Sequence, residues 1–560
     1  MKSFKRWTFL LLIFFFILAL VFVAWFNMYR FIIPNDELSS SESFYLQEHR
    51  NDLVDWKLWS EETLSYAKQV NKPLFLSFGF STCYGCHRMQ SESFRNPFVS
   101  KIINRYFVPI LVDKNQLPLV NQIYSNLMMF QIGSTGWPMT IMATPDGIPL
   151  YLSTYLSKED LLIHLNTILF DWRIQSDLAK VKSFEWLDWY SSSVKIQSKV
   201  PFIDPELSLE QYLSDYFDIQ FSGLMGEQKF PNFLSWSQTL ILSPRFSVYA
   251  KKTVDQILTS TLFDFVEGGV HRYSEAKDWN LPHYEKQFID QVYFIKLLIQ
   301  LYQITNDRLY YDIALFNMDF ILSNYRNVSG QFMTGLDSGT LETIGHYYFF
   351  TDYFLDALSP LNYKRILITA YFNLVALVYP QDFYGVDRRP LKNKRKNSMI
   401  KLKKDEFVSV KNNAVFLKII NDMNLYELNE NYALIFQSLS SFLLNQDVRQ
   451  LQFLDLLISY DALSEINNGL DLSKYEEEVI RRIEKSFPFY KDIAYLPANI
   501  QQYDYMDLYN YEQPLFFILK YRQVFLPDYN DQMMCRDLQK VLVKPWFQLS
   551  LVKLYKKSCN

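Results

Sequence analysis

The sequence predicts a chain of two folded domains, an α/β domain followed by an all-α domain, behind one N-terminal apolar helix. Three observations indicate this arrangement. The run from Trp7 to Phe26 is uncharged and almost wholly apolar. Residues 73–94 pass from a short apolar run to a helical pattern, which is typical of a strand followed by a helix. From Pro205 onward, the apolar spacing is mostly that of helices.

Composition narrows the possible function classes. The chain has 560 residues and only 15 glycines, which disfavours a large β-sandwich and favours helix. A net charge of −4 gives no reason to expect nucleic acid as a partner. Four cysteines are too few for a disulfide scaffold. No cofactor and no metal site is expected.

The N-terminal apolar run, Trp7 to Phe26, matches the roughly 20 residues that cross a bilayer as a helix. Basic residues precede it, and only Arg30 follows closely. The positive-inside rule therefore predicts a single-pass membrane protein with a cytoplasmic N-terminus and an extracytoplasmic bulk. Residues 1–33 are expected to be an uncleaved signal anchor, although a cleaved signal peptide is the alternative. Residues 34–43 are polar and read as a tether.

The α/β domain is expected to begin near Phe44, and its apolar pattern alternates between helices and strands. A helix is expected within 55–70, a strand at 74–78, a helix at 89–94 and another at 99–106. A second strand, 107–113, is apolar enough to be central in a sheet. A helix at 119–130, a strand ending at 142, a turn at 145–147 and a strand at 148–151 complete the domain.

A pair of cysteines, Cys83 and Cys86, lies where the first strand gives way to a helix. A helix N-terminus carries partial positive charge and free N–H groups, which favour a thiolate over a thiol. Cys83 is expected to be the more exposed sulfur and the nucleophile, and Cys86 the resolving thiol. If His87 is protonated, it would further lower the pKa of a thiol. The arrangement is of the thioredoxin type and predicts thiol–disulfide exchange with a protein partner.

Other interpretations of the cysteine pair compete with this one. Cys83, Cys86 and His87 also satisfy the pattern of c-type haem attachment, although a preceding strand is not its usual setting. A zinc half-site is weaker, because Cys535 and Cys559 are distant and do not form a second CxxC. The pair could also be a plain disulfide on a domain that has lost its chemistry. Cys535 and Cys559 are either free or paired with each other.

The dipeptide Trp137-Pro138 precedes the third expected strand, about fifty residues after the cysteines. In thioredoxin-type folds a cis-proline at this place faces the CxxC and turns the preceding backbone toward a bound partner. We therefore expect a cis bond and assign Trp137 and Pro138 to the redox site. An ordinary trans proline that opens a strand is the alternative.

Several motifs in this half fall in the order seen in one known family. They are Ser43–His49, Val54–Trp56, Lys72–Ser77, Ser81–Met89, Glu92–Phe94, Gly136–Pro138 and Thr144–Gly147. In these motifs the chain resembles the spermatogenesis-associated protein 20-like family. The resemblance implies a thioredoxin-like domain, placed at 44–180, fused to a six-hairpin α/α barrel, placed at 200–560. Tyr84-Gly85 replaces the family's His-Trp, and Lys114-Asn115 replaces its Arg-Glu after Asp113.

Helical spacing continues through the second half and supports hairpins packed in a ring or an α-solenoid. No fixed repeat period is visible, which disfavours the solenoid. The expected helices are 207–217, 234–242, 254–265, 288–304, 309–325, 366–378, 414–423 and 432–444. The basic run 388–404 reads as a solvated loop. After about Asn445 the resemblance to the family fades.

A second block that resembles the family gathers charged and aromatic residues around the paired glycines Gly268 and Gly269. Such groups suit a sugar, and the related barrels are sugar epimerases and glycosidases. The residues of this possible barrel pocket are His271, Arg272, His283, Glu285, Asp290 and Asp337. A glycosidase needs two carboxylates, and an epimerase commonly uses histidines.

The barrel pocket nevertheless departs from the family, which has two acidic residues in this segment, separated by one residue. Here Asp337 is the first of them, and Gly339 stands in place of the second. The sequence therefore favours a hydrogen-bonded structural network over catalysis at this place. It leaves three functions open: thiol–disulfide exchange, carbohydrate binding or modification by the barrel, and a scaffold without enzymatic activity.

Overall fold

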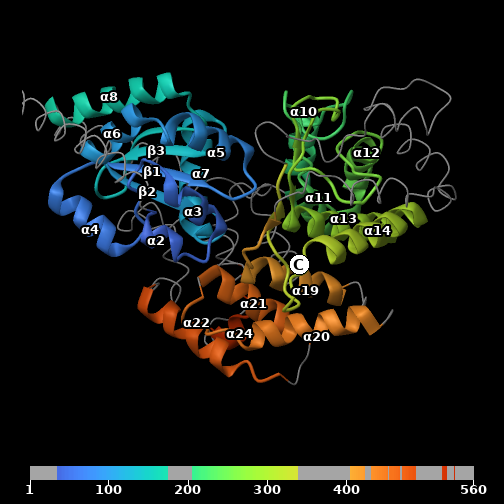
Figure 1. Cartoon of the computed structure of the whole chain (residues 1–560). Coiled ribbons are helices and arrows are strands. Elements are labelled where there is room, and N and C mark those ends of the chain that lie inside the picture. The colour runs from blue at the N-terminus through green and yellow to red at the C-terminus, as the bar shows by residue number, and fades with distance from the viewer. Residues whose placement is uncertain are drawn as a thin grey trace, which may run out of the picture. The chain divides into compact units, whose positions relative to one another are not determined.

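The structure is a computed structural model that describes residues 34–174, 205–338, 404–422, 430–451, 453–466, 470–486, 520–525, 532 and 535. The chain divides into two compact units, Met1–Leu187 and Asp188–Asn560. Each unit has its own hydrophobic core. The first is an α/β unit, and the second is built mainly from helices (Figure 1).

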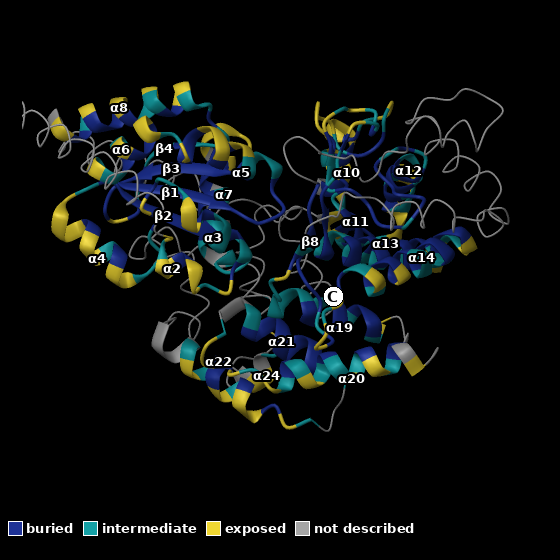
Figure 2. Ribbon diagram, viewed as in Figure 1, coloured by how far each residue is buried: buried dark blue, intermediate teal, exposed yellow. Residues whose placement is uncertain are grey.

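The α/β unit is organised around a four-stranded sheet in the order β2-β1-β3-β4. Its strands are β1 (Leu74–Gly79), β2 (Val108–Asp113), β3 (Met139–Ala143) and β4 (Pro149–Ser153). β1 and β2 are parallel, whereas β3 runs antiparallel to β1 and β4 antiparallel to β3. Every residue of β1, β2 and β3 is buried, as the dark blue strands in Figure 2 show. This burial explains why those segments read as continuous apolar runs.

Both faces of the sheet are covered by other elements. Successive side chains of a strand point to opposite faces, so Phe75 and Phe78 of β1 pack on different sides. Phe75 packs against Phe94 and Phe107 on one face, which the helices α6 (Pro97–Tyr106) and α8 (Lys158–Ile174) also cover. Phe78 packs on the other face against Tyr124 of the helix α7 (Pro118–Ile132). The helical segments of this unit are α2 (Asp36–Ser39), α3 (Phe44–Glu48), η1 (His49–Asn51), α4 (Glu61–Val70), α5 (Tyr84–Met89), η2 (Gln90–Phe94), α6 (Pro97–Tyr106), α7 (Pro118–Ile132) and α8 (Lys158–Ile174).

Three boundaries in the α/β unit differ from the expected ones. The segment expected to be a tether contains α2, and Leu38 in that helix is fully buried. α4 begins only at Glu61, because the Ser60 hydroxyl caps it by accepting from the Thr63 N–H. The helix after the first strand begins at Tyr84 rather than Met89, so Cys86 lies inside it.

The second unit consists of helices that pack in pairs around one core. Asn306 and Asp307 alone separate α13 from α14, so these two form a helical hairpin. The helices are α10 (Pro205–Tyr216), α11 (Phe233–Leu242), α12 (Ser247–Leu258), α13 (Phe288–Thr305), α14 (Arg308–Asn324), α19 (Val410–Asp422), α20 (Glu430–Leu444), α21 (Phe453–Ile466), α22 (Ser473–Ser486) and α24 (Arg522–Phe525), with a short η3 (Pro244–Phe246).

Most of the helices expected in this unit are present. α12 lies earlier than expected, since the chain turns at Thr259 and a loop replaces the last expected turns. The helix expected at 366–378 and most of the basic run 388–404 lie outside the described residues. α21 and α22 fall where the family resemblance fades and were not anticipated. The short strands β5 (Tyr273–Ser274), β6 (Pro282–His283), β7 (Lys286–Gln287), β8 (Gly335–Leu336) and β9 (Lys404–Asp405) form two small sheets.

The predicted single-pass membrane topology requires a correction. A helix needs about 20 apolar residues to cross a bilayer. In the ranges described above, no helix combines the length and the apolar character needed for this. The longest of them, α13, has 18 residues and carries Asp290 and Lys296. The expected span at 7–26 lies outside the described residues. The prediction of a transmembrane helix, and of the location derived from it, is therefore wrong for the described chain and is not carried further.

Candidate functional site

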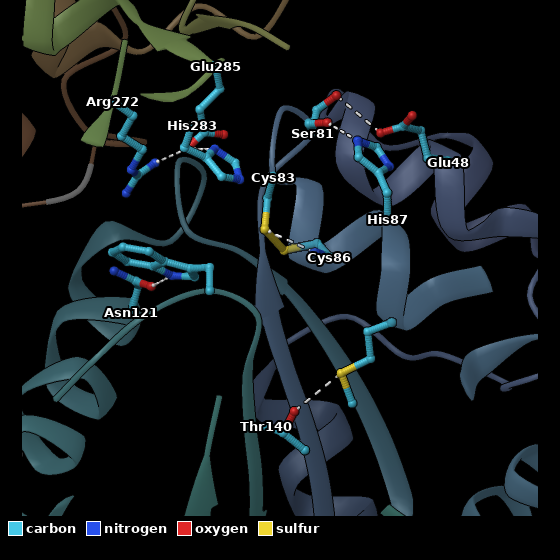
Figure 3. The surroundings of a disulfide bond; sticks show 12 residues. Glu48, Ser81, Cys83, Cys86, His87, Asn121, Thr140, Arg272, His283 and Glu285 are labelled. Atoms are coloured by element: carbon cyan, nitrogen blue, oxygen red, sulfur yellow. Dashed lines mark hydrogen bonds and ion pairs between the residues drawn. A yellow bond between two sulfur atoms is a disulfide. The ribbon is translucent and has the colours of Figure 1, made fainter. Parts of the chain in front are cut away.

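The two motif cysteines lie at the junction of β1 and α5 and are joined by a disulfide (Figure 3). Cys83 is the N-cap residue of α5, with extended backbone, and its Sγ accepts a hydrogen bond from the Cys86 N–H at 3.1 Å. The Cα atoms of the pair are 5.2 Å apart. The sequence therefore placed the pair correctly at a strand-to-helix turn, with one cysteine at the helix start and the other inside its first turn.

The sulfurs are less accessible than the sequence suggested. Cys83 is 3% exposed and Cys86 is 2% exposed, so Cys83 is the more exposed of the two by a small margin, and both are buried. The residues between the cysteines, Tyr84 and Gly85, are half-buried, as is His87. Both cysteines belong to the hydrophobic core of the α/β unit, together with the buried Phe80.

The Trp137–Pro138 peptide bond is cis, as expected. It lies directly against the segment between the cysteines: a Cβ atom placed on Gly85 would meet Pro138 Cδ at 3.0 Å and the Trp137 carbonyl oxygen at 3.2 Å. The absence of a side chain at Gly85 thus permits the close approach of the two loops. The structure therefore brings Cys83, Cys86, Trp137 and Pro138 into one site.

Three residues that the sequence analysis did not assign to the site hold Trp137 in place. The indole N–H donates to Asn121 Oδ1 at 2.8 Å, a contact that Figure 3 draws. Phe80 meets the indole edge to face, with ring centroids 5.9 Å apart. The Lys114 ammonium lies 3.7 Å from the centroid of Phe80 and 4.3 Å from that of Trp137. These cation–π contacts add attraction between the loop after β2 and the cysteine loop.

His87 anchors the loop that precedes the cysteines. Its Nε2 is 2.7 Å from the carbonyl oxygen of Ser81, and because a carbonyl only accepts, this nitrogen carries a proton. The Ser81 hydroxyl donates in turn to Glu48 Oε2 at 3.1 Å (Figure 3). The side chain expected to tune a thiol therefore has a positioning role on the backbone of the cysteine loop.

A buried carboxylate, Asp52, ties this loop region to the following helix. Its side chain is fully buried and accepts hydrogen bonds from Trp56 Nε1 at 3.1 Å and Gln90 Nε2 at 2.9 Å. It also pairs with His49 Nδ1 at 2.5 Å. Gln90 donates a further hydrogen bond to the carbonyl oxygen of Glu48. Because these partners come from η1, η2 and the segment before α4, the network fixes the scaffold behind the cysteines.

In the second unit the structure brings together three of the six expected pocket residues. Arg272 and Glu285 form an ion pair, with Nη1 and Oε1 3.2 Å apart. His283 Nδ1 is 3.9 Å from the same carboxylate oxygen, and its ring stacks on Tyr273 with centroids 4.8 Å apart. The pairing of β5 with β6 places His283 opposite Tyr273 and so aligns the group. Figure 3 labels Arg272, His283 and Glu285.

The remaining expected pocket residues have other surroundings. His271 is buried, and its Nδ1 lies 2.9 Å from the carbonyl oxygen of Tyr284. Asp290 is in the first turn of α13, and Asp337 follows β8 and is buried. The ion pairs of the Arg272 and His283 cluster converge on the Glu285 carboxylate.

The loop around the paired glycines has a structural purpose. Gly268 and Gly269 both have φ in the left-handed region, at 97° and 85°, and a Cβ on Gly269 would lie 2.4 Å from Phe320 Cε1. The buried Lys286 ammonium donates to Asp264 Oδ2 and to the Gly268 carbonyl oxygen, each at 2.8 Å. This part of the block therefore stabilises the helical unit, as the sequence favoured.

No group of three or more histidine, cysteine or acidic side chains suited to a metal ion occurs among the described residues. Cys535 is disulfide-bonded, and Cys559 lies outside the described residues. The chemistry that the described geometry can support is therefore concentrated at the Cys83–Cys86 disulfide, with a separate charged cluster at Arg272 and Glu285.

Comparisons with known proteins agree with this picture. Residues 35–174 match a family model named Thioredox_DsbH, described as a protein of unknown function, DUF255. Spermatogenesis-associated protein 20 of Rattus norvegicus is 30% identical over 323 residues, which are 54% of this chain and 41% of the relative. The comparisons confirm the resemblance to the spermatogenesis-associated protein 20-like family. The human member of that family is 29% identical over 374 residues, which are 60% of this chain and 48% of the relative.

The chain thus spans less than half the length of these curated relatives of the family. Two solved structures give fainter likenesses. A protein titled DsbH oxidoreductase is 20% identical, with a TM-score of 0.18, and the match covers 21% of this chain and 84% of that one. Cellobiose 2-epimerase from Spirochaeta thermophila is 10% identical, with a TM-score of 0.35, covering 66% of this chain and 85% of that one.

Proposed function

We propose that the α/β unit carries out thiol–disulfide exchange with a protein partner through Cys83 and Cys86. The observation that supports this most strongly is the disulfide at the start of α5, lying against the cis Trp137–Pro138 bond. A buried disulfide that served stability alone would need no such neighbour. The backbone of Trp137, which is half-buried, is the part of this loop on which an extended partner segment would lie.

The exchange begins when a partner thiolate attacks Cys83 Sγ. The bond between the two sulfurs of the pair breaks, a mixed disulfide forms at Cys83, and the electron pair leaves on Cys86 Sγ. A second partner thiolate then displaces Cys83, so the partner gains a disulfide and the protein pair is reduced by two electrons. The same steps in reverse reduce a partner disulfide, with Cys83 as the attacking thiolate and Cys86 as the resolving thiol.

Cys83 is assigned as the cysteine that forms the mixed disulfide because its Sγ already accepts a hydrogen bond from the Cys86 N–H. This contact stabilises a thiolate more than a thiol. The 3% exposure of Cys83 means that a partner must displace covering side chains before it reaches the sulfur. Tyr84 and Trp137 are half-buried, so they are the side chains of this site that a partner can meet first.

The test is to trap the intermediate. The Cys86→Ser variant cannot resolve a mixed disulfide, so reduced protein treated with oxidised glutathione is expected to retain one glutathione on Cys83, as mapped by peptide mass spectrometry. A variant with serine at both positions keeps Cys535 and Cys559 and gives the background. If the Cys86→Ser variant carries no more adduct on the motif peptide than the background variant, thiol–disulfide exchange at this site is refuted.

We infer a second candidate function, binding of a polyhydroxylated ligand, from one observation in the helical unit. Glu285 is 2% exposed, and its Oε2 has no hydrogen-bond partner among the described residues. Beside it, Phe230 is 43% exposed and stacks on Tyr273 with centroids 4.8 Å apart. A carboxylate oxygen that can accept a hydroxyl, together with stacked rings, suits a sugar.

A panel of mono- and disaccharides should raise the melting temperature if the helical unit binds one of them, since a ligand of the native state stabilises it. The Glu285→Gln variant keeps the shape but loses the charge, and it is expected to lose the shift. No shift with any sugar would dismiss this candidate.

A further inference from the structure

A tyrosine from the beginning of the domain lies beside the inner sulfur of the disulfide. Tyr45 belongs to α3, and its hydroxyl approaches the end of β1 at Gly79. A Cβ atom on Gly79 would sit 2.3 Å from the Tyr45 hydroxyl oxygen and 2.9 Å from Cys86 Sγ. The hydroxyl and the sulfur therefore reach the same small space from two sides, and it is available because residue 79 has no side chain.

The Tyr45 O–H has no acceptor in this space. The residue is 2% exposed, its oxygen is buried, and the polar group beside it is the Ser77 hydroxyl, which acts on the phenol oxygen as a donor and is otherwise without a partner among the described residues. Leaving a buried hydroxyl unpaired costs free energy, and such groups in native proteins call for an explanation. A disulfide sulfur is a poor acceptor, whereas a thiolate is a strong one. The unpaired donor is thus next to an atom that becomes an acceptor only on reduction.

The phenol keeps its proton at neutral pH. Burial, and next the Asp113 carboxylate, raise the pKa of Tyr45 above its ordinary value, while the Ser77 hydroxyl acts in the opposite direction. Asp113 is 1% exposed and accepts from the Ser43 hydroxyl at 2.6 Å and the Asn115 N–H at 2.8 Å, which hold its position. Tyr45 is therefore a fixed O–H donor rather than a base.

We propose that Tyr45 donates a hydrogen bond to Cys86 Sγ when the disulfide is opened, and that it thereby stabilises the thiolate which leaves in the exchange step. When the partner attacks Cys83, the electron pair of the broken bond is taken up by Cys86 Sγ, and the Tyr45 O–H turns toward it without transferring its proton. Tyr45 is thus a residue that favours the reduced pair. This inference rests on the proposed thiol–disulfide exchange.

The test compares the equilibrium of the full chain with glutathione in wild type and in Tyr45→Phe, which removes only the oxygen. The reduced form of the variant is expected to be disfavoured about tenfold, which equals roughly 30 mV for this two-electron couple. The control is Tyr124→Phe, which removes another buried hydroxyl in the same unit, one already paired with the Gly147 carbonyl oxygen. It is expected to leave the equilibrium unchanged.

A purely structural role for the hydroxyl predicts a different pattern. If the hydroxyl only stabilised the fold, Tyr45→Phe would lower the melting temperature of both redox forms. The proposal expects a lower melting temperature for the reduced form only. The disulfide form should melt at the same or a higher temperature, because it loses an unpaired polar group.

An equilibrium constant of Tyr45→Phe equal to that of wild type, or an equal loss of melting temperature in both forms, overturns the proposal. If wild type itself shows no reversible exchange with glutathione, the proposed function fails instead. Should Tyr45→Phe fail to fold, Ser77→Ala removes the hydroxyl that acts on the phenol oxygen but leaves the Tyr45 O–H in place. It is expected to keep the wild-type glutathione equilibrium, and an approximately tenfold loss of its reduced form would count against Tyr45.

Discussion

Gly79 is the position at which a single added methyl group should have the largest effect on the redox site. In Gly79→Ala the new Cβ would lie 2.3 Å from the Tyr45 hydroxyl oxygen, 2.5 Å from Tyr45 Cζ and 2.9 Å from Cys86 Sγ. Contacts this short require the rigid aromatic ring to shift, and overpacking of a core typically costs about 1–3 kcal/mol. The gain from restricting the unfolded chain offsets only about 0.4–1 kcal/mol of this cost.

We therefore expect Gly79→Ala to destabilise the α/β unit by about 1–2 kcal/mol. The assay is hydrogen exchange of peptides that contain β1, because it reports this unit separately from the helical one. Every 1.4 kcal/mol speeds exchange through global opening about tenfold, so the expected acceleration is roughly 5- to 30-fold.

The matched control is Gly136→Ala in the same unit. A Cβ there would meet only Thr154 Cγ2, at an ordinary 3.6 Å. This variant should exchange no faster than wild type, since the substitution finds space and restricts the unfolded chain. If Gly79→Ala exchanges at the wild-type rate, or if the control is equally fast, the packing of Tyr45, Gly79 and Cys86 described above is incorrect.

Two further predictions concern buried charge. Asp52→Ala leaves the Trp56 indole N–H without its acceptor, removes one of the two hydrogen bonds of the Gln90 amide and breaks the pair with His49, so it should cost roughly 3–5 kcal/mol in thermal unfolding. Asp55→Ala, whose side chain is 67% exposed, should cost less than about 0.5 kcal/mol, and similar losses in both variants would contradict the network. Burial raises the pKa of Asp455 in α21 to about 6, so its folded form binds a proton that the unfolded form has released. The stability that this group contributes is complete below about pH 4 and is lost as the pH rises to about 6 and beyond, while the buried Lys411 nearby opposes the effect of burial on the pKa. Asp455→Asn should therefore flatten this pH dependence of hydrogen exchange in α21, and an unchanged pH dependence in the Asn variant would contradict the assignment.

Features that depend on a few neighbouring residues were predicted well. The strand at 74–78, the strand at 107–113 and the cysteine pair between strand and helix all follow from local apolar pattern and turn chemistry. Gly268 and Gly269 form the tight loop expected of paired glycines because both adopt a positive φ. Helix starts were less accurate, since α4 depends on a single hydroxyl cap at Ser60.

The candidate site was only partly predictable for a physical reason. A motif states which residues are close in the chain, but exposure depends on what covers them, so the sequence could not show that Cys83 is 3% exposed. Nor could residue type show which pocket residues meet, for example that Arg272 pairs with Glu285. Asn121 and Lys114, which hold Trp137 in place, could have been suspected from the sequence only because they lie on segments next to the expected site.

The sequence by itself determined the order of the four strands of the first unit, the strand-to-helix setting of the two cysteines and the family that the chain resembles. These are consequences of backbone preference and apolar period, which act over a turn or two of chain. The tertiary structure alone decided that Tyr45 reaches Cys86 across Gly79 and that Asp52 collects donors from three segments. Such contacts arise only when distant segments are packed to the density of a solid, and their energies depend on which polar groups that packing pairs and which it leaves alone.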